Sequence, residues 1–235
     1  MKRVQDDAST PPLRPAAGTG LVEEVAIQAG GARLAGTLTL PDAAEAVVLF
    51  AHGSGSSRFS PRNRMVAGRL NDAGLGTLLI DLLTAEEQEV DERTGAVRFD
   101  IGLLTERLTG AVDALAGMRE TRALSVGLFG ASTGAAAALA TAAERSGQVA
   151  AVVSRGGRPD LALPVLPRVR APTLLIVGGL DWPVVGMNRQ AAAQLRCEHR
   201  LEIVPGATHL FEEPGALEEV ARLAADWFLL HVKPA

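Results

Sequence analysis

From Leu21 onward, short runs of apolar, β-favouring residues alternate with longer stretches of helical periodicity. This alternation is typical of a mostly parallel sheet that helices cover on both faces. The candidate strands are residues 21–27, 33–40, 46–51, 76–81, 125–129, 150–154, 173–178 and 200–204. The sequence therefore predicts an α/β fold with a sheet of about eight strands.

The candidate strands differ in pattern along the chain. The first two alternate apolar and polar residues around Gly30 and Gly31, which predicts an antiparallel edge pair joined by a tight turn. The later runs are almost wholly apolar, as expected of buried parallel strands. We place one domain at residues 21–235, and we expect residues 1–20, with their Pro, Gly and Ala, to form a flexible leader.

Helices are predicted in the intervals between most of these strands. The candidates are residues 62–73, 101–118, 133–146, 186–195 and 214–230. Residues 82–99 break the rhythm, because they are charged and have no clear period, so we predict a loop there. This loop is either a solvated excursion or a rim that borders a substrate pocket.

The strongest local motif is Gly130-Ala131-Ser132-Thr133-Gly134, which lies between a predicted strand and an alanine-rich helix. G-x-S-x-G in this context holds the serine in a strained turn and presents its hydroxyl above the sheet. Ser132 is therefore the predicted nucleophile. The competing interpretation is a glycine-bracketed turn in which Ser132 only caps the helix.

A serine hydroxyl needs a base, and imidazole is the side chain best suited to this role. His209 follows the last predicted strand, which matches the chain order serine, acid, histidine that accompanies such a turn. His52 comes too early for that order, and His199 and His231 are expected at the surface. We therefore predict that His209 is the base.

A carboxylate must hold the imidazole in one tautomer. Asp181 ends the run TLLIVGGLD and lies between serine and histidine in the sequence, so it is the predicted acid. Asp160, after the preceding strand, is the main competitor. Glu212 and Glu213 are too close to His209 along the chain and are expected to start the final helix.

The oxyanion of an acyl-transfer reaction needs backbone donors. One is the N–H after the nucleophile, at Thr133, and the second is predicted at Ser54 in the run AHGSGSSR. Gly53 and Gly55 would allow this loop to turn inward. The alternative is that His-Gly-Ser-Gly is only a flexible turn.

Substrate contacts are predicted from residues near the mouth of the site. Five arginines gather there: Arg58, Arg62, Arg64, Arg155 and Arg158. They indicate either an anionic substrate or ion pairs with the acidic residues 86–92. The predicted substrate-binding residues are His52, Arg58, Arg155, Trp182 and Phe211. Trp182 and Phe211 would form an apolar wall, or they would serve packing alone.

Composition excludes several classes of function. The formal net charge of −4 gives no basic surface for nucleic acid, and no apolar run reaches the roughly 20 residues that cross a bilayer. Without a secretory-like start, a cytoplasmic location is expected. The single Cys197 allows no internal disulfide. The expected partner is a small molecule, with monomer and homodimer both open.

The runs AHGSGSS, GASTG, VGGLD and GATHLFEEPG, in that order, resemble those of the dienelactone hydrolase-like branch of the α/β-hydrolase superfamily. This resemblance implies an eight-stranded sheet, no cofactor or metal, and hydrolysis of esters or lactones through an acyl-enzyme. True dienelactone hydrolases have a cysteine nucleophile, whereas Ser132 stands here, so a general carboxylesterase is favoured. The short segment between the sixth and seventh strands leaves no room for a large lid domain.

Other functions remain compatible with the same residues. The triad would also serve hydrolysis of an amide, thioester or organophosphate, or acyl transfer to an alcohol. A non-catalytic binding module that keeps the pocket is the alternative from another class.

Overall fold

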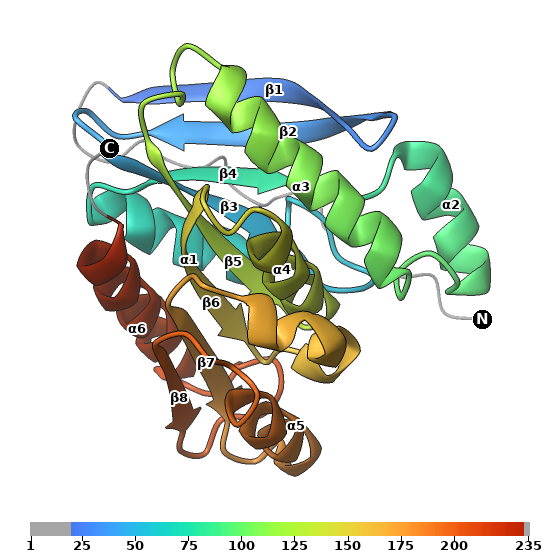
Figure 1. Ribbon diagram of the computed structural model, residues 1–235, viewed down its shortest axis with the longest axis vertical. Coiled ribbons are helices and arrows are strands. Elements are labelled where there is room, and N and C mark those ends of the chain that lie inside the picture. The colour runs from blue at the N-terminus through green and yellow to red at the C-terminus, as the bar shows by residue number, and fades with distance from the viewer. Residues whose placement is uncertain (1–19, 233–235) are drawn as a thin grey trace.

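The computed structural model describes residues 20–232 and contains one eight-stranded sheet with helices on both faces (Figure 1). The order of the strands across the sheet is β1-β2-β4-β3-β5-β6-β7-β8. Their bounds are β1 Leu21–Ala29, β2 Ala32–Leu40, β3 Ala46–Ala51, β4 Gly76–Ile80, β5 Ser125–Ala131, β6 Val149–Arg155, β7 Thr173–Gly178 and β8 His199–Val204. The predicted fold class is confirmed. The predicted leader, apart from Gly20, lies outside the described residues.

The register of the sheet follows the two patterns seen in the sequence. Strand β1 pairs antiparallel with β2 through a two-residue turn, in which Gly30 and Gly31 have φ values of +50° and +70°. Such a turn matches the twist of a hairpin and favours glycine at both positions. Strand β2 is also antiparallel to β4, and all pairs from β4 to β8 are parallel.

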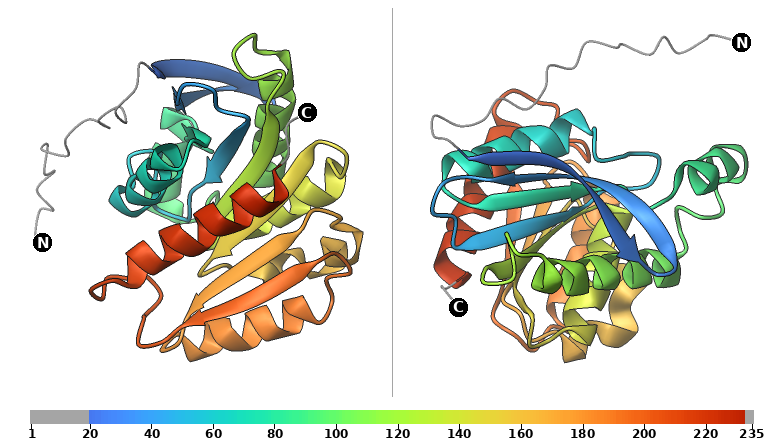
Figure 2. Two further views of the ribbon diagram at one scale, coloured as in Figure 1. Left: turned by 90° about the vertical axis from the view of Figure 1, so that its left-hand side faces the viewer. Right: turned by 90° about the horizontal axis from the view of Figure 1, so that it is seen from above.

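Two apolar cores lie on the two faces of the sheet, each beneath helices that Figure 2 shows from two further directions. Helices α3 (Ile101–Gly117) and α4 (Thr133–Glu144) and the 3-10 segment η1 (Pro159–Arg168) cover one face. Helices α1 (Pro61–Asp72) and α6 (Ala216–His231) cover the other. Because the strands are parallel, their carboxyl ends share one edge, and the loops that carry the predicted site residues start from that edge.

Residues 82–99 are not a loop throughout, contrary to the prediction, because α2 (Ala85–Thr94) forms within them. Thr84 and Glu87 make a reciprocal capping box, and Gly95 ends the helix in the left-handed conformation. These local hydrogen bonds stabilise a helix that lacks an apolar stripe.

Helix ends also differ from the predicted ones. Helix α5 (Trp182–Ala192) begins four residues earlier than residue 186, because Pro183 suits its first turn. Helix α6 begins at Ala216, after Gly215 in the left-handed conformation. The segment η1, with Pro164 and Pro167 inside it, was not predicted.

We expect Thr84→Ala to weaken α2, because it removes the acceptor for the Glu87 N–H. Loss of such a cap costs about 1 kcal/mol. Amide hydrogen exchange across residues 85–94 should become faster by the factor that corresponds to this loss of free energy. Glu89→Ala, an exposed change in the same helix, is the control, and unchanged protection in Thr84→Ala would contradict the capping role.

Candidate active site

Ser132 lies in a sharp turn between β5 and α4, with φ +51° and ψ −120°. L residues rarely adopt this conformation, so the turn is strained. The glycines on either side permit it. A Cβ at Gly130 would lie 2.4 Å from Ala135 Cα, and a Cβ at Gly134 would lie 2.3 Å from Ala51 O. The motif thus has the strand-turn-helix setting that the sequence predicts.

Hydrogen bonds to the end of β6 and to the turn after it hold the backbone of Ser132 in place. Its N–H donates to Arg155 O at 3.2 Å, and its carbonyl accepts from the Arg158 N–H at 3.1 Å. Ser132 occupies the N-cap position of α4, but its side chain makes no capping hydrogen bond. The hydroxyl is therefore not used by the helix, which argues against the purely structural interpretation of the motif.

His209 contacts the carboxylate predicted for it. Nδ1 of His209 lies 2.6 Å from Asp181 Oδ2, and the two side chains are 40% and 14% exposed. The competitor Asp160 instead receives two hydrogen bonds from Arg158, both 2.8 Å long. Of the two candidate acids, Asp181 is the one that meets the histidine.

The loops that carry Asp181 and His209 pack directly against each other. A Cβ at Gly178 would lie 2.4 Å from Thr208 O, so only glycine allows the histidine loop to cross the end of β7. The Leu180 N–H donates to Ala207 O at 2.9 Å. Acid and base are therefore held by one packed unit.

Contrary to the prediction, Glu213 does not start the final helix but stabilises the loop that carries His209. Its carboxylate accepts hydrogen bonds from the Thr208 hydroxyl at 2.6 Å and the Thr208 N–H at 3.1 Å. These bonds lower the pKa of Glu213. The side chain thus closes the loop around His209 through a local contact across five residues, a role that the predicted helix start did not include.

Gly156 lies next to His209, and the residue before it binds Ser132. Gly156 follows Arg155, whose carbonyl binds the serine N–H, and a Cβ at Gly156 would lie 3.5 Å from His209 Cε1. Among residues 20–232, no hydrogen bond joins the Ser132 hydroxyl to His209. The structure brings together the acid and the base, and it places the serine on the same edge.

The predicted oxyanion loop reaches the nucleophile. A Cβ at Gly53 would lie only 3.0 Å from Ser132 Cβ, so the chain passes close to the serine just before Ser54. Thr133, the other predicted donor, is buried at the first turn of α4. Thr133 thus adjoins Ser132 along the chain, and the residue before Ser54 adjoins it in space.

His52 was predicted to contact substrate, but both of its ring nitrogens bind backbone. The Leu82 N–H donates to Nε2 at 3.0 Å, so Nδ1 carries the proton and donates to Gly53 O at 2.9 Å. Burial lowers the pKa of His52, against smaller opposing effects of Gly53 and Asp81. The imidazole is neutral and connects the start of the predicted oxyanion loop to the chain that follows β4.

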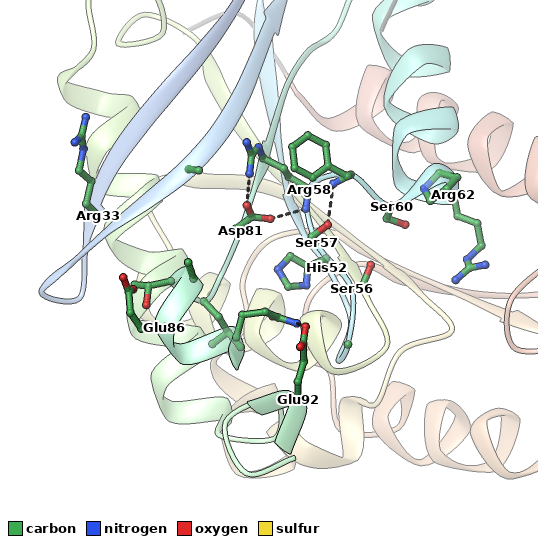
Figure 3. A pocket seen from close by; sticks show the side chains of 18 residues that line it. Arg33, His52, Ser56, Ser57, Arg58, Ser60, Arg62, Asp81, Glu86 and Glu92 are labelled. Carbon is green, nitrogen blue, oxygen red and sulfur yellow. Dashed lines mark hydrogen bonds and ion pairs between the residues drawn. The ribbon is translucent and has the colours of Figure 1, made fainter. Parts of the chain in front are cut away.

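A polar hollow of about 1030 Å³ lies beside the oxyanion loop (Figure 3). Serines 56, 57 and 60 and Arg58 lie along one wall, and Glu86 and Glu92 of α2 lie across from them. Segment 82–99 therefore borders a pocket, as one of the two interpretations of it proposed. Among the described residues that line this hollow, neither Ser132 nor His209 is present.

The five arginines near the mouth do not pair with residues 86–92 in the described part of the chain. Arg58 pairs with Asp81 and Glu24, and Arg62 pairs with Glu212. The acidic segment finds other partners, since Glu87 binds Arg107 and Asp91 binds Arg98. The predicted ion pairs between these arginines and residues 86–92 are therefore wrong, because Arg58, Arg62 and Arg158 pair with other carboxylates.

Arg155 differs from the other arginines of this group. It is 9% exposed and has no ion pair within residues 20–232, and its buried Nη1 has no hydrogen-bond partner there. Burial, with repulsion from Arg62, lowers the pKa of Arg155 to about 10. It remains a cation at neutral pH.

The two predicted aromatic wall residues have opposite environments. Trp182 is 73% exposed at the start of α5, next to Asp181. Phe211 is only 1% exposed, and it packs in the core between the sheet and α6. Phe211 is therefore a packing residue, and its predicted role as a pocket wall is wrong.

The arrangement is that of an α/β hydrolase, and comparisons with known proteins agree. The sequence model of the "Dienelactone hydrolase family" matches residues 34–230. A crystal structure of a dienelactone hydrolase from Anabaena variabilis is 59% identical, with a TM-score of 0.90 over 91% of this chain and 99% of that one. The chain belongs to the dienelactone hydrolase family.

More distant and longer proteins are also similar. Est1E from Butyrivibrio proteoclasticus has a TM-score of 0.74 at 15% identity, over 88% of this chain and 98% of that one, which shows the shared fold alone. Two Mycobacterium tuberculosis proteins, provisionally named phosphoribosyl transferases, are 55% identical over 97% of this chain. The chain spans about half (49%) of the length of these curated relatives. Within residues 20–232, no helix combines the length and apolarity needed to cross a membrane.

His52 should make folding stability depend on pH. Because its pKa in the folded protein lies below the ordinary 6.5, the unfolded chain binds the proton more readily, and stability falls as the pH drops below 6.5. His52→Asn should remove this part of the acid destabilisation. Urea unfolding at several pH values between about 7.5 and 5 measures it. His199→Asn, an exposed histidine, is the control, and an acid slope unchanged in His52→Asn would contradict the assignment.

Proposed function

We propose that this chain is a serine hydrolase that cleaves carboxylic esters or lactones of small molecules through an acyl-enzyme on Ser132. The observation that carries the proposal is the 2.6 Å contact between His209 Nδ1 and Asp181 Oδ2, on the same sheet edge as the strained serine. The contact favours the tautomer with the proton on Nδ1, which leaves Nε2 free to accept a proton.

In the proposed mechanism, the Ser132 hydroxyl attacks the ester carbonyl carbon while His209 Nε2 takes its proton. The oxyanion accepts hydrogen bonds from the backbone N–H groups of Ser54 and Thr133. When the intermediate collapses, the bond to the alcohol breaks and His209 returns the proton to the leaving oxygen. Water, activated by His209, then attacks the acyl-enzyme, and the released acid leaves Ser132 with its proton restored.

The contact between Ser132 and His209 need not be made in the free protein. The serine hydroxyl can rotate, and catalytic hydrogen bonds in unliganded enzymes are often long and shorten when substrate binds. Gly156, which lies beside His209 and directly follows the residue bound to the Ser132 N–H, adds no side chain at that position.

The proposed substrates are small or accessible esters. The exposed Trp182 beside Asp181 offers an apolar surface near the reacting atoms, and the segment between β6 and β7 is the short η1. The transferase name of the Mycobacterium tuberculosis relatives belongs to proteins about twice as long. Hydrolase chemistry is proposed for the part that this chain shares with them.

Ser132→Ala should reduce p-nitrophenyl acetate turnover to the background rate, a loss of roughly a million-fold in kcat if the triad acts as a unit. Ser146→Ala, near the far end of α4, is the matched control and should retain full activity. A fluorophosphonate probe should label the wild-type chain at Ser132. Undiminished turnover by a folded Ser132→Ala variant would contradict the proposal.

Asp181→Asn should lower kcat by about 10⁴-fold, because the amide no longer holds the productive histidine tautomer. Asp160→Asn tests the rival carboxylate with the same chemical change and should lower kcat far less. Steady-state kinetics on one ester compares the two variants. Greater loss in Asp160→Asn than in Asp181→Asn would reverse the acid assignment.

A further inference from the structure

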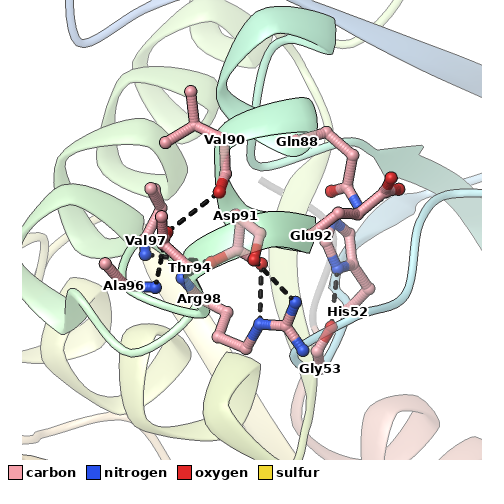
Figure 4. Close-up of polar contacts among 10 residues, drawn as sticks. All are labelled: His52, Gly53, Gln88, Val90, Asp91, Glu92, Thr94, Ala96, Val97 and Arg98. Carbon is pink, nitrogen blue, oxygen red and sulfur yellow. Dashed lines mark hydrogen bonds and ion pairs between the residues drawn. The ribbon is translucent and has the colours of Figure 1, made fainter.

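An ion pair with a buried carboxylate lies directly beside the predicted oxyanion loop (Figure 4). Asp91, in α2, is fully buried. Its Oδ1 accepts hydrogen bonds from the N–H groups of Val97 and Arg98 at 2.9 and 2.7 Å, and Oδ2 accepts from Arg98 Nε at 2.7 Å. Burial raises the pKa of Asp91, but these hydrogen bonds outweigh burial and hold the pKa below its ordinary value. The carboxylate is therefore ionised and completely engaged.

The guanidinium of Arg98 is fixed by this pair in a single orientation. Nε binds the Asp91 carboxylate, and Nη2 donates to Asp91 O at 3.0 Å. The remaining nitrogen, Nη1, lies 3.4 Å from the position of a Cβ at Gly55. Nη1 is thus the part of the ion pair that faces the oxyanion loop.

Arg98 also lies close to both predicted oxyanion donors. Arg98, Ser54 and Thr133 border one small cavity of about 10 Å³, roughly the volume of one water-sized group. The Oγ1 atom of Thr133 is buried, and it has no hydrogen-bond partner among residues 20–232. The cavity lies between the loop of one donor, the helix start of the other, and the guanidinium.

The segment that carries this ion pair is anchored to the rest of the protein. Glu87 of α2 binds Arg107 Nη2 at 2.9 Å, and Arg107 Nη1 donates to Ala29 O at 2.9 Å. At its other end, Leu82 binds His52. Residues 82–98 therefore contact the oxyanion loop at two places, through His52 and through Arg98.

We infer that Arg98, clamped by Asp91, is a positioning residue that holds the oxyanion loop in its reactive geometry. This inference rests on the proposed hydrolase function. Donors stabilise an oxyanion only if they are in place before charge develops, since reorganisation during the reaction reduces the gain. The ion pair also directs Nη1 of the Arg98 guanidinium toward the predicted oxyanion loop, where the negative charge of the oxyanion would form.

The geometry requires an arginine at position 98. Its planar group uses one edge for Asp91 and keeps Nη1 for the loop, whereas a lysine ammonium would be a single point charge. Arg98→Lys should therefore fail to restore the function of Arg98, although it keeps the charge.

The test measures kcat, KM and inhibition by a phenylboronic acid, which forms a tetrahedral adduct with an active serine. Arg98→Met should lower kcat by about 10- to 100-fold, leave KM within about twofold, and weaken boronic acid binding by about the same factor as kcat. Asp91→Asn should show the same pattern more weakly. Titration of active serine with a fluorophosphonate corrects each rate for unfolded protein.

Arg145→Met is the matched control. Arg145 binds Asp113 through the same two nitrogens, Nε and Nη2, both at 2.8 Å, but at the far end of α4. It should lose an ion pair made by the same two nitrogens, with a more exposed carboxylate, and keep wild-type kcat and boronic acid affinity. The inference would be overturned, and the proposed function left intact, if Arg98→Met kept wild-type kcat or if Arg145→Met lost as much kcat as Arg98→Met. A wild-type chain without any ester turnover or serine labelling would overturn the proposed function and the inference with it.

Discussion

The close packing of α4 against β3 determines the geometry of the whole candidate site. The helix passes so near the strand that Gly134 has no space for a side chain, and Ser132 must then take its left-handed conformation at the end of β5. A strained residue of this kind costs about 1–3 kcal/mol and persists only where its surroundings fix it. The strain is offset by the burial of nearly all of α4, whose alanines fit closely against the sheet.

Much of this arrangement could be predicted, because it depends on local patterns. Apolar runs of strand length identified the eight strands, and paired glycines identified the hairpin between β1 and β2. Glycines around Ser132 predicted the turn, since few other sequences fit that backbone. Asp181 and His209 were assigned from chain order, and the short distance between them now supports that assignment.

The errors have two causes: local capping, which apolar periodicity does not reveal, and contacts between segments distant in sequence. Helix α2 has little apolar periodicity and depends on side-chain capping, so a search for amphipathic stripes missed it. Phe211 follows a predicted catalytic residue closely, yet a positive φ turns the chain so that its ring is buried under α6. The two nitrogens of His52 bind residues on either side of a loop crossing, which sequence spacing does not reveal.

Gly178 has a further consequence for how such a protein could change its substrate range. The end of β7 and the histidine loop touch backbone to backbone, so any displacement of the acid would carry the base with it. Substitutions at the end of β7 or in the histidine loop would disturb proton transfer before they altered substrate selectivity. Substitutions that admit new substrates should therefore be found on the other side of the site, in the serine-rich turn before α1 and in α2, which faces it.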